Sequence, residues 1–286
     1  MSADVTERRL AVLRFLVAAY AAVWSAVRAP ALLDPLAFAD RRFDPVGPLG
    51  LLEGPLPDVV LIGLVIAAPV SCAVFALGRF PTISGPVAAF TFLVVTTYRN
   101  SWGQLFHTEN LVALHLVVLA VAAYTCSERR WAIDAMAVLT VGTYAVAGVA
   151  KLRISGLAWL DGDVLRHQIA FDNARKELLG DVSSPFAGWF LRQGWLLGPA
   201  AVATMVVELG APLALLGRRW ALGWSVMAFG FHVAITMFMA ILFPYQLLGI
   251  ALAPLLPMEH LAQWLPRRSR DLAGAAPIKP AELGPR

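Results

Sequence analysis

The chain has 286 residues, of which 59% are hydrophobic and only 15% are charged, and its mean hydropathy is +0.69. A soluble domain carries about a quarter charged residues, so this composition excludes an ordinary soluble domain and indicates an integral membrane protein. The net charge is +4, and the basic residues lie mostly in short loops and at the termini. That distribution is typical of topology determinants, not of a nucleic-acid-binding surface. Cys72 and Cys126 form no spaced framework, so neither a disulfide scaffold nor a zinc site is indicated.

The apolar runs predict an all-α integral membrane protein, a multi-span bundle of about eight transmembrane helices. A helix needs about 20 apolar residues to cross the hydrocarbon core. The runs are continuous and lack the alternation of a β-barrel, so helices are expected. The third run is short, and the last contains Pro254 and Pro257, which makes these two the least regular. In chain order the expected spans are residues 8–29, 57–78, 81–98, 108–127, 131–152, 199–216, 220–242 and 244–262.

Two long connections and a tail separate or follow these runs. Residues 30–56 are rich in proline and charge, and we expect an ordered or semi-ordered external loop. Residues 153–198 contain the stretch GDVLRHQIAFDNARKELL, whose mixed charges and helical spacing predict an interfacial amphipathic helix. Residues 266–286 are rich in proline, alanine and glycine, which predicts a disordered cytoplasmic tail after a transmembrane domain of residues 1–265.

The basic residues of the short loops predict a multi-pass protein of the cell membrane with both termini in the cytoplasm. This orientation places His107 and Lys151 at the same, external end of their helices. Glu208 and His232 then lie at similar depth on successive antiparallel helices, so they could touch. The short segments expected inside carry Arg8, Arg9, Arg14, Arg79, Arg129, Arg130, Arg218, Arg219, Arg267, Arg268 and Arg270.

Lys151 closes an apolar run and is the main functional lead. A lysine in an apolar pocket loses basicity, because desolvation disfavours its charged form, and it can then act as a base. The alternative is a lysine that anchors a helix end by reaching the membrane surface. Its neighbours Trp159, Asp161 and Gly162 make a polar exit from the span.

A dense run of hydrogen-bonding side chains surrounds His107. Such a cluster at the edge of a span suits the polar head of a ligand, although His107 could also be a plain interfacial residue or part of a helix cap. We expect ligand contacts from the residues around it, namely Arg99, Asn100, Gln104 and Asn110.

Glu208 lies near the middle of an apolar run, where it cannot remain both charged and unpaired. It is either protonated or paired with His232, a lysine or an arginine. A structural hydrogen bond between Glu208 and His232 is one reading, and a proton relay or a ligand contact is the other. His115 lies on a different face from His107 and is expected to be structural. Metal-ligand spacing is absent from the sequence, so no metal is expected.

Four stretches resemble the HTTM family, the membrane domain shared with vitamin K-dependent γ-glutamyl carboxylase. The likeness covers most of residues 8–260. In this family the lysine of a Gly-x-x-Lys-Leu segment, here Lys151, is the proposed base, and the resemblance also assigns His107, Glu208 and His232 to the site. The four stretches are RNSWGQLFHTENLVALHLVVLA, GVAKLRISGLAWLDGD, MVVELGAPLALL and GFHVAITMFMAILFPYQLLGIALAPL.

The resemblance implies chemistry on vitamin K hydroquinone or another isoprenoid quinol, by a quinol-using lyase or oxidoreductase of the carboxylase and epoxidase kind. The lysine deprotonates the quinol, and oxygenation then yields a strong base. The carboxylase carries a large lumenal portion after its membrane domain, and this sequence does not, so carboxylation of glutamyl peptides is not expected. The expected partners are the lipid bilayer and an amphiphilic small molecule, with no nucleic acid and with any protein partner left open.

A second class of function remains open from the sequence. The chain could be a non-catalytic membrane accessory or assembly subunit of the DoxX-like kind, in which the polar groups only bind or stabilise. A small-molecule transporter is disfavoured, because we find neither an inverted repeat nor paired broken helices.

Overall fold

The computed structural model describes residues 3–103, 105–125 and 129–265, and within these ranges it is helical without any β-strand. The chain divides into two compact units. The first contains the described residues up to 136 and those from 257 to 265, and the second comprises residues 137–256. The predicted tail, residues 266–286, lies outside the described residues, as do Gln104 and Cys126.

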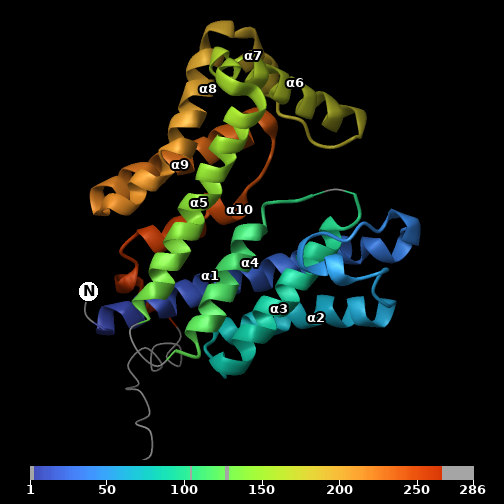
Figure 1. Ribbon diagram of the computed structural model, residues 1–286, viewed down its shortest axis with the longest axis vertical. Helices are drawn as coiled ribbons and strands as arrows, with labels where there is room; N and C mark the ends of the chain where they lie inside the picture. Colours follow the sequence, from blue (N-terminus) through green and yellow to red (C-terminus); the bar gives the residue numbers. More distant parts are fainter. Residues whose placement is uncertain (1–2, 104, 126–128, 266–286) are drawn as a thin grey trace, which may run out of the picture. The chain divides into compact units, whose positions relative to one another are not determined.

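Four helices in chain order form the first unit, and in Figure 1 they lie beside one another in blue to green. Their facing surfaces bury small residues, among them Ala18 and Ala21 on the first helix and Ala68 and Cys72 on the second. Small residues let helices approach closely where no water drives their association. The helices are α1 (Ala3–Leu33), α2 (Asp58–Ala76), α3 (Pro81–Asn100) and α4 (Asn110–Ala122), and η7 (Glu259–Trp264) packs along α1.

The connection between α1 and α2 is ordered, as expected. It contains three short 3₁₀ helices, η1 (Asp34–Ala37), η2 (Asp40–Arg42) and η3 (Gly47–Leu51). Its backbone is fastened to the end of α3: Asp44 N donates to Ser101 O at 2.8 Å, and Leu56 N donates to Tyr98 Oη at 3.2 Å.

The second unit is built around α5, α8 and α9. Val141, Tyr144, Val207, Trp224 and Leu252 pack in its central cluster. Figure 1 draws these elements from green through olive to orange. They are α5 (Arg130–Ser155, from residue 137 onward), η4 (Gly156–Asp161), α6 (Asp163–Leu178), α7 (Ala187–Arg192), α8 (Gly194–Leu209), η5 (Ala211–Leu216), α9 (Arg218–Met239), α10 (Pro244–Leu247) and η6 (Ile250–Leu255).

Within the described residues, five helical stretches are long and apolar enough to cross a membrane, fewer than the eight expected. Two further apolar helices are shorter: α4 has 13 residues and α8 has 16. At 1.5 Å per residue α4 is only about 20 Å long, against about 30 Å of hydrocarbon. The five are Ala3–Ala37, Asp58–Ala76, Pro81–Asn100, Arg130–Asp161 and Arg218–Met239.

Proline and glycine account for the interrupted runs. Pro212 has no N–H to donate to the carbonyl of Glu208, so α8 ends at Leu209 and continues only as the 3₁₀ helix η5. The run expected over 244–262 is not one helix but a single α-helical turn followed by the 3₁₀ helices η6 and η7. Gly249 adopts a left-handed conformation, with φ of 72°, between the first two pieces.

The long connection after α5 contains the predicted helix, α6, together with η4 and α7. Polar side chains of this region hold the C-terminal end of α9. Asn173 Nδ2 donates to Phe238 O at 3.0 Å, and Lys176 Nζ donates to Met239 O. These side chains satisfy carbonyls that a helix end leaves without intrahelical partners.

Candidate functional site

One face of α5 carries Tyr144, Gly148 and Lys151, which are spaced by four and three positions. Gly148 allows α8 to approach closely. A Cβ at this position would lie 2.8 Å from Leu209 Cδ2 and 3.0 Å from Glu208 Cβ. Glu208 therefore meets α5 between Tyr144 and Lys151.

Lys151 and Glu208 form an ion pair in which Nζ donates a hydrogen bond to Oε1. The Glu208 side chain is 4% exposed and the Lys151 side chain 24% exposed. The second carboxylate oxygen, Oε2, is buried and has no hydrogen-bond partner among the described residues. A paired lysine offsets part of the cost of burying the carboxylate, while Oε2 keeps its capacity to accept a hydrogen bond.

The ring of Trp159 lies beside the Lys151–Glu208 pair. The centroid of its ring lies 5.2 Å from Lys151 Nζ, within the range of a cation–π contact. The indole Nε1 donates to Thr204 Oγ1 at 3.1 Å. Gly162 fixes this arrangement, because it has φ of 87° and a Cβ there would lie 2.4 Å from the carbonyl carbon of Leu197. Packing and hydrogen bonding therefore explain both Trp159 and Gly162 of the Trp-x-x-Gly segment.

Tyr144 and His232 form a second polar pair, with Tyr144 Oη 2.7 Å from His232 Nε2. Both residues are buried. His232 Nδ1 has no partner among the described residues. Tyr144 also packs edge-on against Trp224, with ring centroids 4.9 Å apart.

Of the partners that the sequence left open for Glu208, the structure shows a lysine, Lys151, and not His232. Each residue has a different partner, Lys151 for Glu208 and Tyr144 for His232. Tyr144 nevertheless lies within electrostatic reach of Glu208. Sequence reasoning missed Tyr144, although its position seven residues before Lys151 puts both on one helical face.

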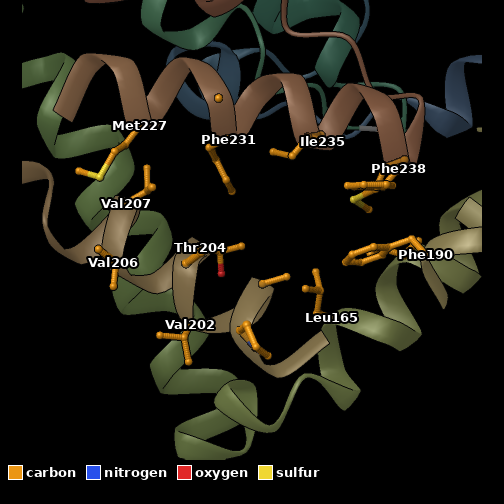
Figure 2. Close-up of a pocket in the computed structure, with 17 residues that line it drawn as sticks. Leu165, Phe190, Val202, Thr204, Val206, Val207, Met227, Phe231, Ile235 and Phe238 are labelled. Atoms are coloured by element: carbon orange, nitrogen blue, oxygen red, sulfur yellow. The ribbon is translucent and has the colours of Figure 1, made fainter. Parts of the chain in front are cut away.

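An apolar cavity of about 610 Å³ lies on another side of α8, within the same unit. Figure 2 shows Phe231, Ile235 and Phe238 of α9 pointing toward it, opposite side chains of α8. Thr204 is the one polar side chain in its lining, and Thr204 Oγ1 accepts the Trp159 hydrogen bond. The volume of the cavity falls in the range of small-molecule pockets, about 300–1,000 Å³.

The other predicted residues lie in the first unit. Asn100 fastens a loop: its Nδ2 donates to Phe106 O at 3.1 Å, and its Oδ1 accepts from Phe106 N at 2.9 Å. The Arg99 guanidinium carbon lies 3.6 Å from the centroid of the Phe106 ring. His107 and Asn110 are exposed around the start of α4.

The structure thus brings together Lys151, Glu208 and Trp159, while His232 pairs with Tyr144, which lies on the same face of α5 as Lys151. Gln104 lies outside the described residues, and the predicted sharing of one rim by His107 and Lys151 stays a prediction. Scans of protein-family models, curated proteins and solved structures found no match to this chain.

Proposed function

We propose that this chain is a multi-pass membrane protein of the HTTM kind that takes a proton from an isoprenoid quinol or a similar amphiphile, with Lys151 as the base. The observation that carries the proposal is the Lys151–Glu208 pair, whose carboxylate is buried and keeps one oxygen without a hydrogen-bond partner among the described residues. An ionisable pair within apolar helices is costly and is typically functional.

The pair can supply a base because it can exist in two forms. As an ion pair it consists of an ammonium and a carboxylate. Transfer of one proton from Lys151 to Glu208 would give a neutral amine and a neutral acid, and the burial of Glu208 favours its uncharged form. The amine of Lys151 then accepts the proton of a quinol hydroxyl, and the ammonium that results attracts the quinolate.

The apolar cavity supports an amphiphile as the ligand. Its lining suits a hydrocarbon tail, and Thr204 joins it through Trp159 to the neighbourhood of Lys151. A tail in the cavity would leave the polar head near the indole. The proposal assigns vitamin K hydroquinone or another isoprenoid quinol to this place.

The proposal includes eight membrane segments with both termini in the cytoplasm. Five helical stretches meet the length requirement, and α8 with η5 adds a sixth. Sixteen residues at 1.5 Å and six at about 2.0 Å span about 36 Å. The short α4 and the broken 244–264 segment complete the eight.

Oxidation of a quinol tests the base directly. Deprotonated hydroquinones react with oxygen faster than neutral ones, so the purified protein should accelerate oxygen consumption by an added isoprenoid hydroquinone. Lys151→Arg keeps the cation but cannot provide a neutral amine, because arginine stays protonated. We expect this variant to lose the acceleration at least tenfold while it still folds and binds the quinol.

The matched control is Arg153→Lys, which exchanges one cation for another at an exposed position of the same helix. It should leave the rate unchanged. Mass spectrometry of lipids extracted from the gently purified protein should also find about one quinone per chain. An unaltered rate in Lys151→Arg, together with no bound quinone, would exclude the base and favour the non-catalytic accessory subunit.

A further inference from the structure

A second cavity, of about 390 Å³, lies in the first unit and has a different chemistry. It is placed where α1 and α3 end, beside the connection that follows α1. Its lining includes Arg42, Arg99 and Trp102, all of which lie in the first unit.

Both arginines are held by aromatic rings and not by carboxylates. Arg99 Cζ lies 3.6 Å from the Phe106 centroid, and Arg42 Cζ lies 4.9 Å from the Phe38 centroid. At 3.6 Å the guanidinium is stacked on the ring, which leaves its N–H edges free to donate. Neither arginine has a carboxylate within 4.0 Å in the described part of the chain.

Trp102 provides the independent observation. The residue is only 6% exposed, yet its indole Nε1 has no hydrogen-bond partner among the described residues. A buried donor without an acceptor costs about 1–3 kcal/mol, so such groups call for an explanation. Trp102 lines the cavity, so an acceptor bound there would satisfy this donor after a small shift of the buried ring.

Asp34 is the acidic residue in the lining, and it is exposed. Glu109, which follows Phe106 in the chain, attracts the Arg99 guanidinium electrostatically, and Arg28 repels it. The lining itself carries two arginines and one acidic residue. Arg99 lies in the last turn of α3, where a cation is favourable, but that role requires neither Arg42 nor the open indole N–H.

We propose that this cavity binds a phosphate group, either on a phospholipid headgroup or free in solution. Two guanidinium groups and one indole N–H can donate to three different oxygens, and the terminal oxygens of a phosphate accept in this way. The rings of Phe38 and Phe106 pack against the less polar part of the ligand. Because α1 and α3 are both long enough to cross a membrane, their ends fall where headgroups lie.

Lipid titration of the delipidated full-length protein, followed by native mass spectrometry, tests the proposal. The probes are phosphatidic acid, the phosphate-free diacylglycerol with the same chains, and inorganic phosphate. We expect one phosphatidic acid per chain, bound at least tenfold more tightly than the diacylglycerol. Competition by millimolar inorganic phosphate would identify free phosphate as an equally good source, and its absence would identify the headgroup.

Variants assign the binding to this cavity. The double variant Arg42→Gln, Arg99→Gln should weaken phosphatidic acid binding at least tenfold, since each charge-assisted hydrogen bond contributes strongly. Trp102→Phe keeps a ring and removes only the N–H, and it should weaken binding several-fold. Arg41→Gln is the matched control on an adjacent exposed residue outside the lining, and it should bind normally.

Equal affinity for phosphatidic acid and diacylglycerol, or unchanged binding in the double variant, would overturn the proposal. If Arg99→Gln impairs folding, Arg42→Gln alone serves, because Arg42 is exposed. The quinol assay reports on Lys151 and the lipid titration reports on Arg42 and Arg99, so failure of either proposal leaves the other standing.

Discussion

Gly148 decides whether the Lys151–Glu208 pair can form, because it sets the distance between α5 and α8. The two charged residues lie 57 positions apart in the chain, and they meet only where this glycine removes a side chain from the helix surface. A charged pair in an apolar bundle is thus made possible by a residue that carries no chemistry of its own.

Gly148→Ala should destabilise the protein. The added Cβ would lie 2.8 Å from Leu209 Cδ2 and 3.0 Å from Glu208 Cβ, so the Leu209 side chain must turn away and Glu208 must shift by a few tenths of an ångström. Overpacking of this kind costs about 1–3 kcal/mol. Thermal unfolding in detergent, followed by circular dichroism, should show a lower midpoint.

The matched control is Gly142→Ala on the same helix, where a Cβ would meet nothing within 4 Å. Alanine favours a helix over glycine by up to about 1 kcal/mol, so this variant should unfold at the same or a higher temperature. Equal midpoints for the two variants would show that α8 does not pack against Gly148.

The sequence predicted the members of this site better than their contacts. Lys151, Glu208 and His232 are recognisable because a polar residue in an apolar run needs a partner. Which partner each one takes depends on helix rotation, and one residue of rotation moves a side chain by about 100°. Tyr144 shows why the contacts were not predicted. Its hydroxyl is the hydrogen-bond partner of His232, but a tyrosine in an apolar helix does not stand out in the sequence. His115, expected to be structural, is fully buried and its Nε2 lies 3.2 Å from Met136 O.

At the scale of whole elements, uninterrupted apolar runs gave helices at the expected places. Residues 81–98 were predicted as a short run flanked by glycine and proline, yet they form part of a 20-residue helix that continues through Pro86. The failures follow from backbone chemistry that hydropathy does not measure. Pro212 ends α8, and Gly249 with Pro254 replaces one predicted span by 3₁₀ pieces.

The helix α6 was predicted from its mixed pattern of charged and apolar residues. Polar side chains of α6 also form hydrogen bonds to the end of α9. Asn173, Lys176 and Ser184, the last in the loop that follows, donate to three consecutive carbonyls at the end of α9. The acceptors belong to Met237, Phe238 and Met239. A cation such as Lys176 is favourable at a helix C-terminus.

Lys176→Met should loosen the end of α9, because methionine keeps the length of the side chain but cannot donate. The lysine is buried, and a hydrogen bond from a charged donor contributes about 1.5–3 kcal/mol. We expect a lower unfolding midpoint and faster proteolysis in the loop after α6. Gln168→Met makes a comparable change at an exposed position of α6 and should alter neither measurement. The same midpoint in both variants would contradict a capping role for Lys176.

At the scale of the whole molecule, the short connections are basic while the helices they join are apolar. Arg79 follows α2, Arg130 begins α5 and Arg218 begins α9, and all three are exposed. Basic residues in short loops remain on the cytoplasmic side during membrane insertion. An even number of crossings then returns both termini to that side, which is the orientation proposed here.

Cysteine labelling tests this orientation one connection at a time. In a background where Cys72 and Cys126 are replaced, single cysteines at positions 79, 130, 218 and 268 should react with a membrane-impermeant maleimide only after spheroplasts are opened. Leu51→Cys is the control for the opposite side. Leu51 is 92% exposed in the α1–α2 connection, so this cysteine should react in intact spheroplasts.

Labelling of position 130 from outside, with position 79 still protected, would mean that α3 and α4 do not both cross. The short α4 would then lie at the surface, and His107 would not share a rim with Lys151. Labelling of all four positions from outside would instead reverse the whole orientation.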